Sequence, residues 1–330
     1  MSSVPDHLPV FLAVDVEPDT VALDVAAPAP FHGYEAAHRC LSEARPLLED
    51  RTGSPVRYCW FVRMDPQIAR VYGSLTWIAE RYGPLLDASA RAGDEIGLHP
   101  HWHRWDATLG DWRIDVTDRS WIEDGLQSAL EGFVTAFGRP CRTVSFGSWV
   151  SDHLFRLADR AGIRFDLSLR PGQRRARARE VGGVSRVALP SHLGLPRHPY
   201  RPARTNFRRP GATDRLDLTL IPLTSGPVRV RPSVRGIAGR ARYVLASGLR
   251  DWRPRVLLTM SVARASPNLF ADLLGRVLDA GPTHLAFVDR SDFGINRLEG
   301  FRGALRVLAE HPARERLAFT TPPAAFACGS

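Results

Sequence analysis

The residues best suited to chemistry are three histidines, His99, His101 and His103, which alternate just after a short apolar run. The chain has only 11 histidines in 330 residues, so this spacing is a marked concentration. Imidazole is the commonest metal ligand among side chains because its neutral nitrogen offers a lone pair near physiological pH. The pattern predicts a strand that delivers metal ligands to its C-terminal end.

A second cluster supplies carboxylates, because Asp15 and Glu17 alternate at the end of an apolar run near the N-terminus. Catalytic zinc typically takes three protein ligands and leaves one position for water. Glu17, His99 and His103 would provide a carboxylate and two imidazoles. Asp15 lies on the same face of the strand as Glu17 and could take a proton from that water. Together the two clusters predict a mononuclear metal hydrolase.

Three alternatives stay open at this point. The acidic cluster could be a solvated turn, the histidines could form a surface cluster, or the metal could use a different pair of histidines.

Strand-like and helix-like runs alternate along the chain, which favours an α/β fold with a parallel sheet. Ligand-like residues at the C-terminal ends of strands favour a barrel over an open, doubly wound sheet, and no Gly-rich phosphate motif supports that rival. The expected strands are 10–16, 56–62, 95–99, 143–146, 163–169, 216–223, 255–262, 284–288 and 317–321. The expected helices are 34–49, 67–91 with a break near Gly83-Pro84, 121–137, 152–161, 268–280 and 298–310.

Residues 171–253 are rich in Pro, Arg and Gly and interrupt this alternation. We interpret them as an excursion over the barrel mouth, since long excursions in compact domains are usually functional lids or disordered. The net charge is +9. All 44 Lys-plus-Arg residues are arginine, and this uniformity suggests a composition bias of the genome. The arginine blocks of this insertion could contact an anionic membrane surface. No nucleic-acid module accompanies them, so nucleic-acid binding is disfavoured.

The four cysteines are widely spaced and form no CxxC pair, so neither a zinc knuckle nor a disulfide scaffold is expected. No signal peptide precedes the first strand and no apolar run reaches about 18 residues. We therefore expect a cytoplasmic protein, with membrane association left open. One domain is expected over residues 8–325, with tails at 1–7 and 326–330. The sequence does not indicate an oligomeric state.

These motifs resemble those of the polysaccharide deacetylase family, also called the NodB-homology domain or carbohydrate esterase family 4. In that family strand one ends in an acidic pair, written Asp-x-Glu in some members, as in Asp15-Val16-Glu17. A His-x-x-x-His pair follows, matched by His99 and His103 within "GDEIGLHPHWH". The segments "RYCWFVRMD" and "SFGSWVSDHLFRLADRAGIRFDLSLRP" also resemble the family. The resemblance covers residues 8–325, weakly in the insertion.

The resemblance implies a deformed (β/α) barrel of about seven parallel strands. It implies hydrolysis of an N-acetyl group from an amino sugar of a glycan or glycolipid, or of a similar carbon–nitrogen bond outside a peptide. Asp15 would be the general base, and Glu17, His99 and His103 would bind a divalent ion, with Zn²⁺ expected and Co²⁺, Mn²⁺ or Ni²⁺ as alternatives. The expected partner is a carbohydrate or glycolipid substrate.

Two departures from the family pattern bear on activity. The family usually has an arginine that orients the base where this chain has Ser145, and a late histidine that acts as the acid is missing from residues 257–262. His101, His192 or His198 could substitute as the acid. The departures support an alternative, a degenerate member that binds saccharide or metal without turnover. A third reading is an adaptor that binds anionic lipid or nucleic acid.

Several aromatic residues could bind substrate beside the metal. The candidates for contacts with a sugar are His101, Trp102, Trp105 and Trp149. Trp112 fits packing better than binding.

Overall fold

A computed structural model describes residues 7–20, 23–147, 149–173, 176–177, 188–228, 256–259 and 266–326. Among these, an 8-stranded parallel sheet has the order β12-β7-β6-β3-β2-β1-β15, and β16 also pairs with β1. Its strands are β1 (Leu8–Val16), β2 (Cys59–Val62), β3 (Glu95–Leu98), β6 (Thr143–Val144), β7 (Phe165–Asp166), β12 (Thr219–Leu220), β15 (Leu285–Arg290) and β16 (Leu317–Phe319).

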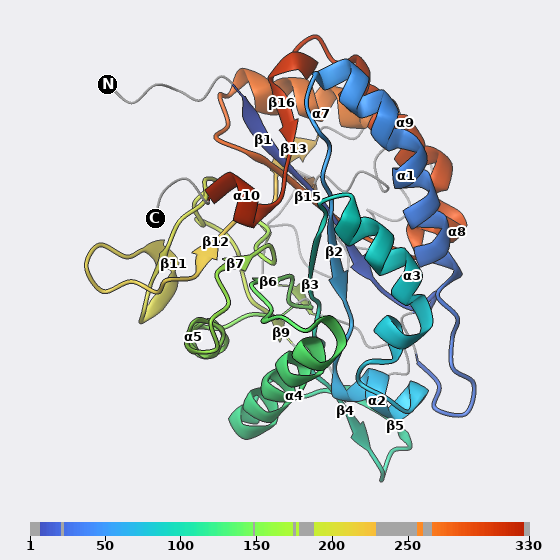
Figure 1. The fold of residues 1–330 in the computed structure, drawn as a ribbon. Helices are drawn as coiled ribbons and strands as arrows, with labels where there is room; N and C mark the ends of the chain where they lie inside the picture. The colour runs from blue at the N-terminus through green and yellow to red at the C-terminus, as the bar shows by residue number, and fades with distance from the viewer. Residues whose placement is uncertain are drawn as a thin grey trace, which may run out of the picture.

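The sheet curls into a half barrel whose outer side is covered by helices (Figure 1). Its two edges approach each other after β12, where Thr224 N donates to Ala286 O of β15 at 2.9 Å. The helices are α1 (His32–Thr52), α2 (Pro66–Tyr72), α3 (Trp77–Arg91), α4 (Arg119–Phe137), α5 (Asp152–Arg160), α7 (Pro267–Asp279), α8 (Phe293–Asn296), α9 (Leu298–Glu310), the short 3-10 helix η2 (Arg314–Arg316) and α10 (Pro322–Phe326). The predicted class, a deformed (β/α) barrel of parallel strands, is confirmed.

Residues of both faces of the sheet are buried, as parallel strands require. In β1, Phe11 and Ala13 join Phe61 of β2 in a small cluster inside the half barrel. Leu12 and Val14 point the other way, into the larger core beneath the helices. This alternation decides which side chains beyond the strand ends reach the interior.

Most predicted elements are present, with three differences. The helical stretch 67–91 forms two helices, because α2 ends at Gly73, which has a positive φ. The predicted break near Gly83-Pro84 is confirmed, since Tyr82 is non-helical just before it. The hairpin of β4 (His103–Asp106) and β5 (Asp111–Ile114) was not predicted. The described part of strand 255–262, β14 (Val256–Thr259), pairs antiparallel with β13 (Ser225–Val228) outside the main sheet.

The predicted insertion is described only in part. Residues 188–228 form the hairpin of β10 (Pro202–Ala203) and β11 (Asn206–Pro210) and add β12 to the sheet. The pair β8 (Ala176–Arg177) and β9 (Ala188–Leu189) flanks a gap. Of the arginine blocks at 170–179, 197–209 and 229–255, the second is described, the first is described in part, and the third lies outside the described residues.

Two smaller expectations concern cysteines and membranes. Cys40, Cys59 and Cys141 are free and buried, and Cys328 lies outside the described residues. Over the described chain, no helix combines the length and apolarity that a membrane crossing needs.

Candidate metal centre

Strand alternation brings the candidate residues to one end of the half barrel. Asp15 and Glu17 continue the inward positions of Phe11 and Ala13 in β1. His99 follows β3 at the inward position set by Gly97, where an added Cβ would lie 2.8 Å from the Phe61 ring. Asp15, Glu17 and His99 are all buried.

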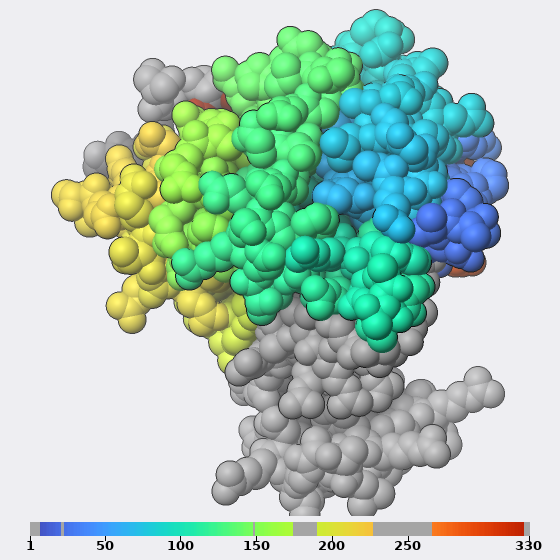
Figure 2. Space-filling model, turned by 90° about the horizontal axis from the view of Figure 1, so that it is seen from below, coloured from blue at the N-terminus to red at the C-terminus, as the bar shows by residue number. Residues whose placement is uncertain are grey.

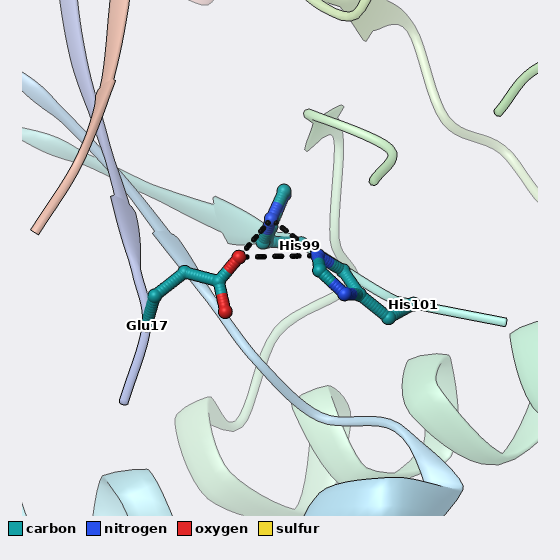
Figure 3. A group of neighbouring side chains, drawn as sticks. All are labelled: Glu17, His99 and His101. Atoms are coloured by element: carbon teal, nitrogen blue, oxygen red, sulfur yellow. Dashed lines mark hydrogen bonds and ion pairs between the residues drawn. The ribbon is translucent and has the colours of Figure 1, made fainter. Parts of the chain in front are cut away.

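Three ligand atoms converge, those of Glu17, His99 and His101 (Figure 3). Glu17 Oε1 lies 3.1 Å from His99 Nε2 and 3.1 Å from His101 Nε2, and the two nitrogens are 2.9 Å apart. Ligand atoms bound to one ion at about 2.1 Å, at right angles or slightly more, lie roughly 3.0–3.4 Å apart. One carboxylate and two imidazoles, spaced in this way, fit a divalent metal ion.

The surroundings of His99 set its tautomer for metal binding. Its Nδ1 contacts the main-chain carbonyl of Ser145, so Nδ1 carries the proton and Nε2 keeps its lone pair toward Glu17 and His101. Ligating histidines are commonly oriented by such a bond. Burial by itself lowers the pKa of His99, but the carboxylates of Asp15 and Glu17 outweigh burial and raise it.

An arginine that the sequence reasoning missed holds the other oxygen of Glu17. Arg63 Nη1 donates to Glu17 Oε2 at 2.9 Å, and both side chains are buried. The same guanidinium binds Asp65 through Nε and Nη2, at 2.5 and 3.0 Å. Asp65 caps α2 and also accepts the backbone N–H of His101 at 3.1 Å. The pair Arg63–Asp65 therefore positions ligands from two segments.

A second arginine, Arg290 at the end of β15, reaches Glu17 from the opposite side. Its Nη1 is 3.7 Å from Glu17 Oε1. Burial by itself raises the pKa of Glu17, but His101 and the two arginines outweigh it and hold the pKa well below its ordinary value. The carboxylate is thus the stable form, as a metal ligand must be.

His101 and His103 occupy different places from those the sequence suggested. His101 supplies the third converging atom, whereas His103 begins β4 with its ring centroid 5.2 Å from that of His101. Burial lowers the pKa of His101 to about 3 and that of His103 to about 4, so both are neutral near pH 7. The assignment of His103 as a ligand stays a prediction.

Asp15 is placed to act as a base beside this cluster. Its Oδ1 lies 3.4 Å from His99 Nδ1 and has no hydrogen-bond partner among the described residues. Burial raises the pKa of Asp15, and His99, a hydrogen bond with Ser145 and the charge of Arg170 oppose that rise. Ser145 thus contacts Asp15 from the position where the polysaccharide deacetylases usually have an arginine, and Arg170, from the loop after β7, supplies a positive charge.

The substitutes considered for the missing acid differ in position. His192 is buried, and its Nδ1 accepts the N–H of Arg170 at 3.1 Å, so Nε2 carries the proton. Burial lowers its pKa to about 4, which leaves a neutral ring that is a hydrogen-bond donor rather than an acid near pH 7. His198 lines a hollow together with His284. His284 comes just before β15, about 20 Å along the strand from Arg290, so His198 lies at the opposite end of β15 from the candidate metal centre.

The candidate aromatic residues are dispersed around the site. Trp102 is only 3% exposed and packs against Phe146 in the core, which limits its access to a ligand. Trp105 is half-buried in the β4–β5 hairpin, against Trp112 and Arg70. Trp149 is half-buried and lines an open hollow.

At its C-terminal strand ends the α/β half barrel therefore brings Glu17, His99 and His101 together beside the buried Asp15. No family model matches the sequence. Several solved structures share the fold of this chain.

One such structure is a Mycobacterium smegmatis protein proposed to be a polysaccharide deacetylase, with 14% identity and a TM-score of 0.50 over 98% of this chain and 91% of that one. A Parabacteroides distasonis protein proposed to be a glycoside hydrolase or deacetylase has 12% identity and a TM-score of 0.56, over 96% and 70%. The PuuE allantoinase has 12% identity and a TM-score of 0.51, over 96% and 89%. The chain therefore has the polysaccharide deacetylase fold, and the resemblance in sequence is confirmed at that level.

Proposed function

We propose that the protein is a metal-dependent hydrolase that removes N-acetyl groups from an amino sugar of a glycan or glycolipid. The observation that carries this proposal is the convergence of Glu17, His99 and His101 next to Asp15. The same arrangement accommodates a related carbon–nitrogen bond outside a peptide. Zn²⁺ is the expected ion, with Co²⁺, Mn²⁺ or Ni²⁺ as alternatives.

A divalent ion held at this site would supply a Lewis acid for the acyl oxygen and would lower the pKa of a water molecule. Glu17, His99 and His101 would hold it, with His103 beside them as the alternative ligand. Asp15 accepts the proton of the attacking water, because its Oδ1 is free of hydrogen bonds among the described residues. Ser145 and Arg170 favour the carboxylate form that this step needs.

His192 is suited to bind the substrate rather than to act as the acid. Its Nε2–H is buried and lacks an acceptor within the described chain, next to Ser145 and Arg170. A buried donor without a partner costs free energy, so it favours a ligand that brings an acceptor. We assign His192 a hydrogen bond to substrate. The leaving amine then takes its proton from protonated Asp15 or from solvent.

A catalytically inactive binding protein is the second candidate. The observation that favours it is that Arg63 and Arg290 already balance the charge of Glu17 without an ion. Ser145, at a position where the family usually has an arginine, also favours this candidate. The adaptor reading, in which the arginine-rich insertion docks on anionic lipid, concerns a segment that is described only in part.

An acetate-release screen separates the first two candidates. Purified protein of measured metal content is incubated with acetylated amino sugars and chitooligosaccharides, with and without added Zn²⁺, Co²⁺, Mn²⁺ or Ni²⁺. The hydrolase predicts metal-dependent acetate release from at least one substrate. Absence of release under every metal, from protein that binds the ion, would support the binding protein.

A further inference from the structure

The open hollow lined by Trp149 is not used by the mechanism above. It encloses about 550 Å³ between the first turns of α4 and α5, with Trp149 on its wall. Figure 2 shows the face of the molecule on which the green surface, which includes α4, meets the yellow-green surface of residues further along the chain. Its size is that of sites that take small molecules.

The walls of this hollow are tied to the metal centre. Trp149 N donates to the carbonyl of Gly147, and Gly147 packs so closely on His101 that an added Cβ would lie 2.4 Å from its ring. On the other wall, Val116 and Thr117 follow Asp115, whose N–H binds the carbonyl of Trp102 at 2.8 Å. Both walls therefore continue from the neighbours of His101.

The hollow has an excess of positive charge. Arg119 and Arg156 line it, and neither forms an ion pair with a carboxylate of the described residues. Asp152 also lines the hollow and accepts the N–H of Phe207 at 2.5 Å, so two arginines there face one carboxylate. Glu123, outside the lining, lies 3.6 Å from Arg160. The N-terminal ends of α4 and α5 add partial positive charge.

His153 supports the same conclusion from within the hollow. Its Nε2 is buried and has no hydrogen-bond partner in the described part of the chain. Burial lowers the pKa of His153, and Arg119 and Arg156 lower it further. Two guanidiniums without a carboxylate partner and an imidazole nitrogen without a hydrogen-bond partner among the described residues, beside one indole, are suited to an oxyanion on a ring-shaped ligand.

We propose that this hollow is a subsite for an anionic saccharide, in which Arg119, His153 and Arg156 bind a phosphate or carboxylate group and Trp149 packs against the sugar ring. Naming the substrate class in this way rests on the proposed hydrolase function. The binding itself requires neither a metal ion nor turnover, so it can be tested separately.

The test is isothermal titration calorimetry on the full-length chain stripped of metal with a chelator. The probes are N-acetylglucosamine 6-phosphate, N-acetylmuramic acid, inorganic phosphate and, as the neutral reference, N-acetylglucosamine. We expect at least one anionic sugar to bind about tenfold more tightly than the neutral sugar, because charge-assisted hydrogen bonds contribute that much. Added salt should weaken this preference.

The variants Arg119→Gln and Arg156→Gln should each remove most of the preference. Arg160→Gln is the matched control, because it removes the same charge from α5 at an exposed residue beside Glu123. Trp149→Ala should weaken sugar binding but leave inorganic phosphate binding unchanged. Circular dichroism confirms that each variant is folded.

Equal affinity for neutral and anionic sugars would overturn the subsite. So would variants at Arg119 and Arg156 that match Arg160→Gln. Anion preference without acetate release would uphold the subsite and count against the hydrolase. Acetate release from a neutral sugar, without any preference for anionic sugars in binding, would support the hydrolase and overturn the subsite.

Discussion

Arg63 and Glu17 form a buried ion pair, with 2.9 Å between Nη1 and Oε2, and their side chains are 2% and 3% exposed. The arginine neutralises one oxygen of the carboxylate and leaves Oε1 directed at His99 and His101. The pair therefore orients a metal ligand and also keeps it charged while no ion is bound. This double role makes Arg63 central to both stability and metal affinity.

Replacement of Arg63 by methionine should destabilise the protein by about 3–5 kcal/mol, because it leaves Glu17 and Asp65 buried without their partner. Urea unfolding of metal-free protein measures the effect. The exposed control Arg160→Gln should change the free energy of unfolding by no more than about 0.5 kcal/mol. A loss below about 1 kcal/mol for Arg63→Met would mean that the two carboxylates are neutral or solvated.

The choice between His101 and His103 as the second histidine ligand can be tested by the metal affinities of alanine variants. Loss of a direct ligand should cost more than the roughly 10–100-fold in affinity that loss of an outer partner costs. We expect that large loss for His99→Ala and His101→Ala, and a smaller one for His103→Ala. Competition with a chromophoric chelator measures the affinities. A larger loss for His103→Ala than for His101→Ala would favour the ligand pair predicted from the sequence.

Gly147→Ala tests the place of His101 without removing a ligand. The new Cβ would lie 2.4 Å from His101 Cδ2, so the ring must leave the position in which its Nε2 lies 3.1 Å from Glu17 Oε1. Metal affinity should fall roughly as far as in a variant that loses an outer partner, about 10–100-fold. Gly83→Ala is the matched control, because it introduces a Cβ into open space. Gly138→Ala is unsuitable, because Gly138 has a positive φ that strains any other residue. Equal affinity in the Gly147 and Gly83 variants would contradict the arrangement.

Metal affinity should depend on pH through His99. Its folded pKa is raised above the ordinary value, so protons compete with the ion at a higher pH than for an exposed histidine. Affinity should be highest above that pKa and fall about tenfold per pH unit below it. In metal-free protein the sign is opposite: the stability gained by charged His99 is present at low pH and lost as pH rises. Zn²⁺ affinity that is constant from pH 8 to pH 5.5 would contradict this.

The sequence was sufficient to predict which strands meet at the site. Parallel strands place their C-terminal ends at one edge, and alternation fixes Asp15, Glu17 and His99 on the inner face. The same alternation offered a signal for Arg63 and Arg290, which continue the inward positions of Phe61 and Val288. That signal was missed because neither arginine belongs to a recognised motif.

The choice between His101 and His103 could not be made from spacing. Beyond Leu98 the chain leaves β3, so alternation no longer determines where side chains point. The position of His101 depends on Asp65, which binds its N–H, and on the close contact of Gly147. Both contacts come from distant segments.

The central claim is that Asp15 acts as the base for a metal-dependent hydrolysis. The most direct measurement compares acetate release by wild type and Asp15→Asn, on the best substrate of the screen and at equal, measured metal content. We predict that Asp15→Asn keeps its metal and releases acetate about 10²–10⁴-fold more slowly. Release by Asp15→Asn within a factor of a few of wild type would contradict the account.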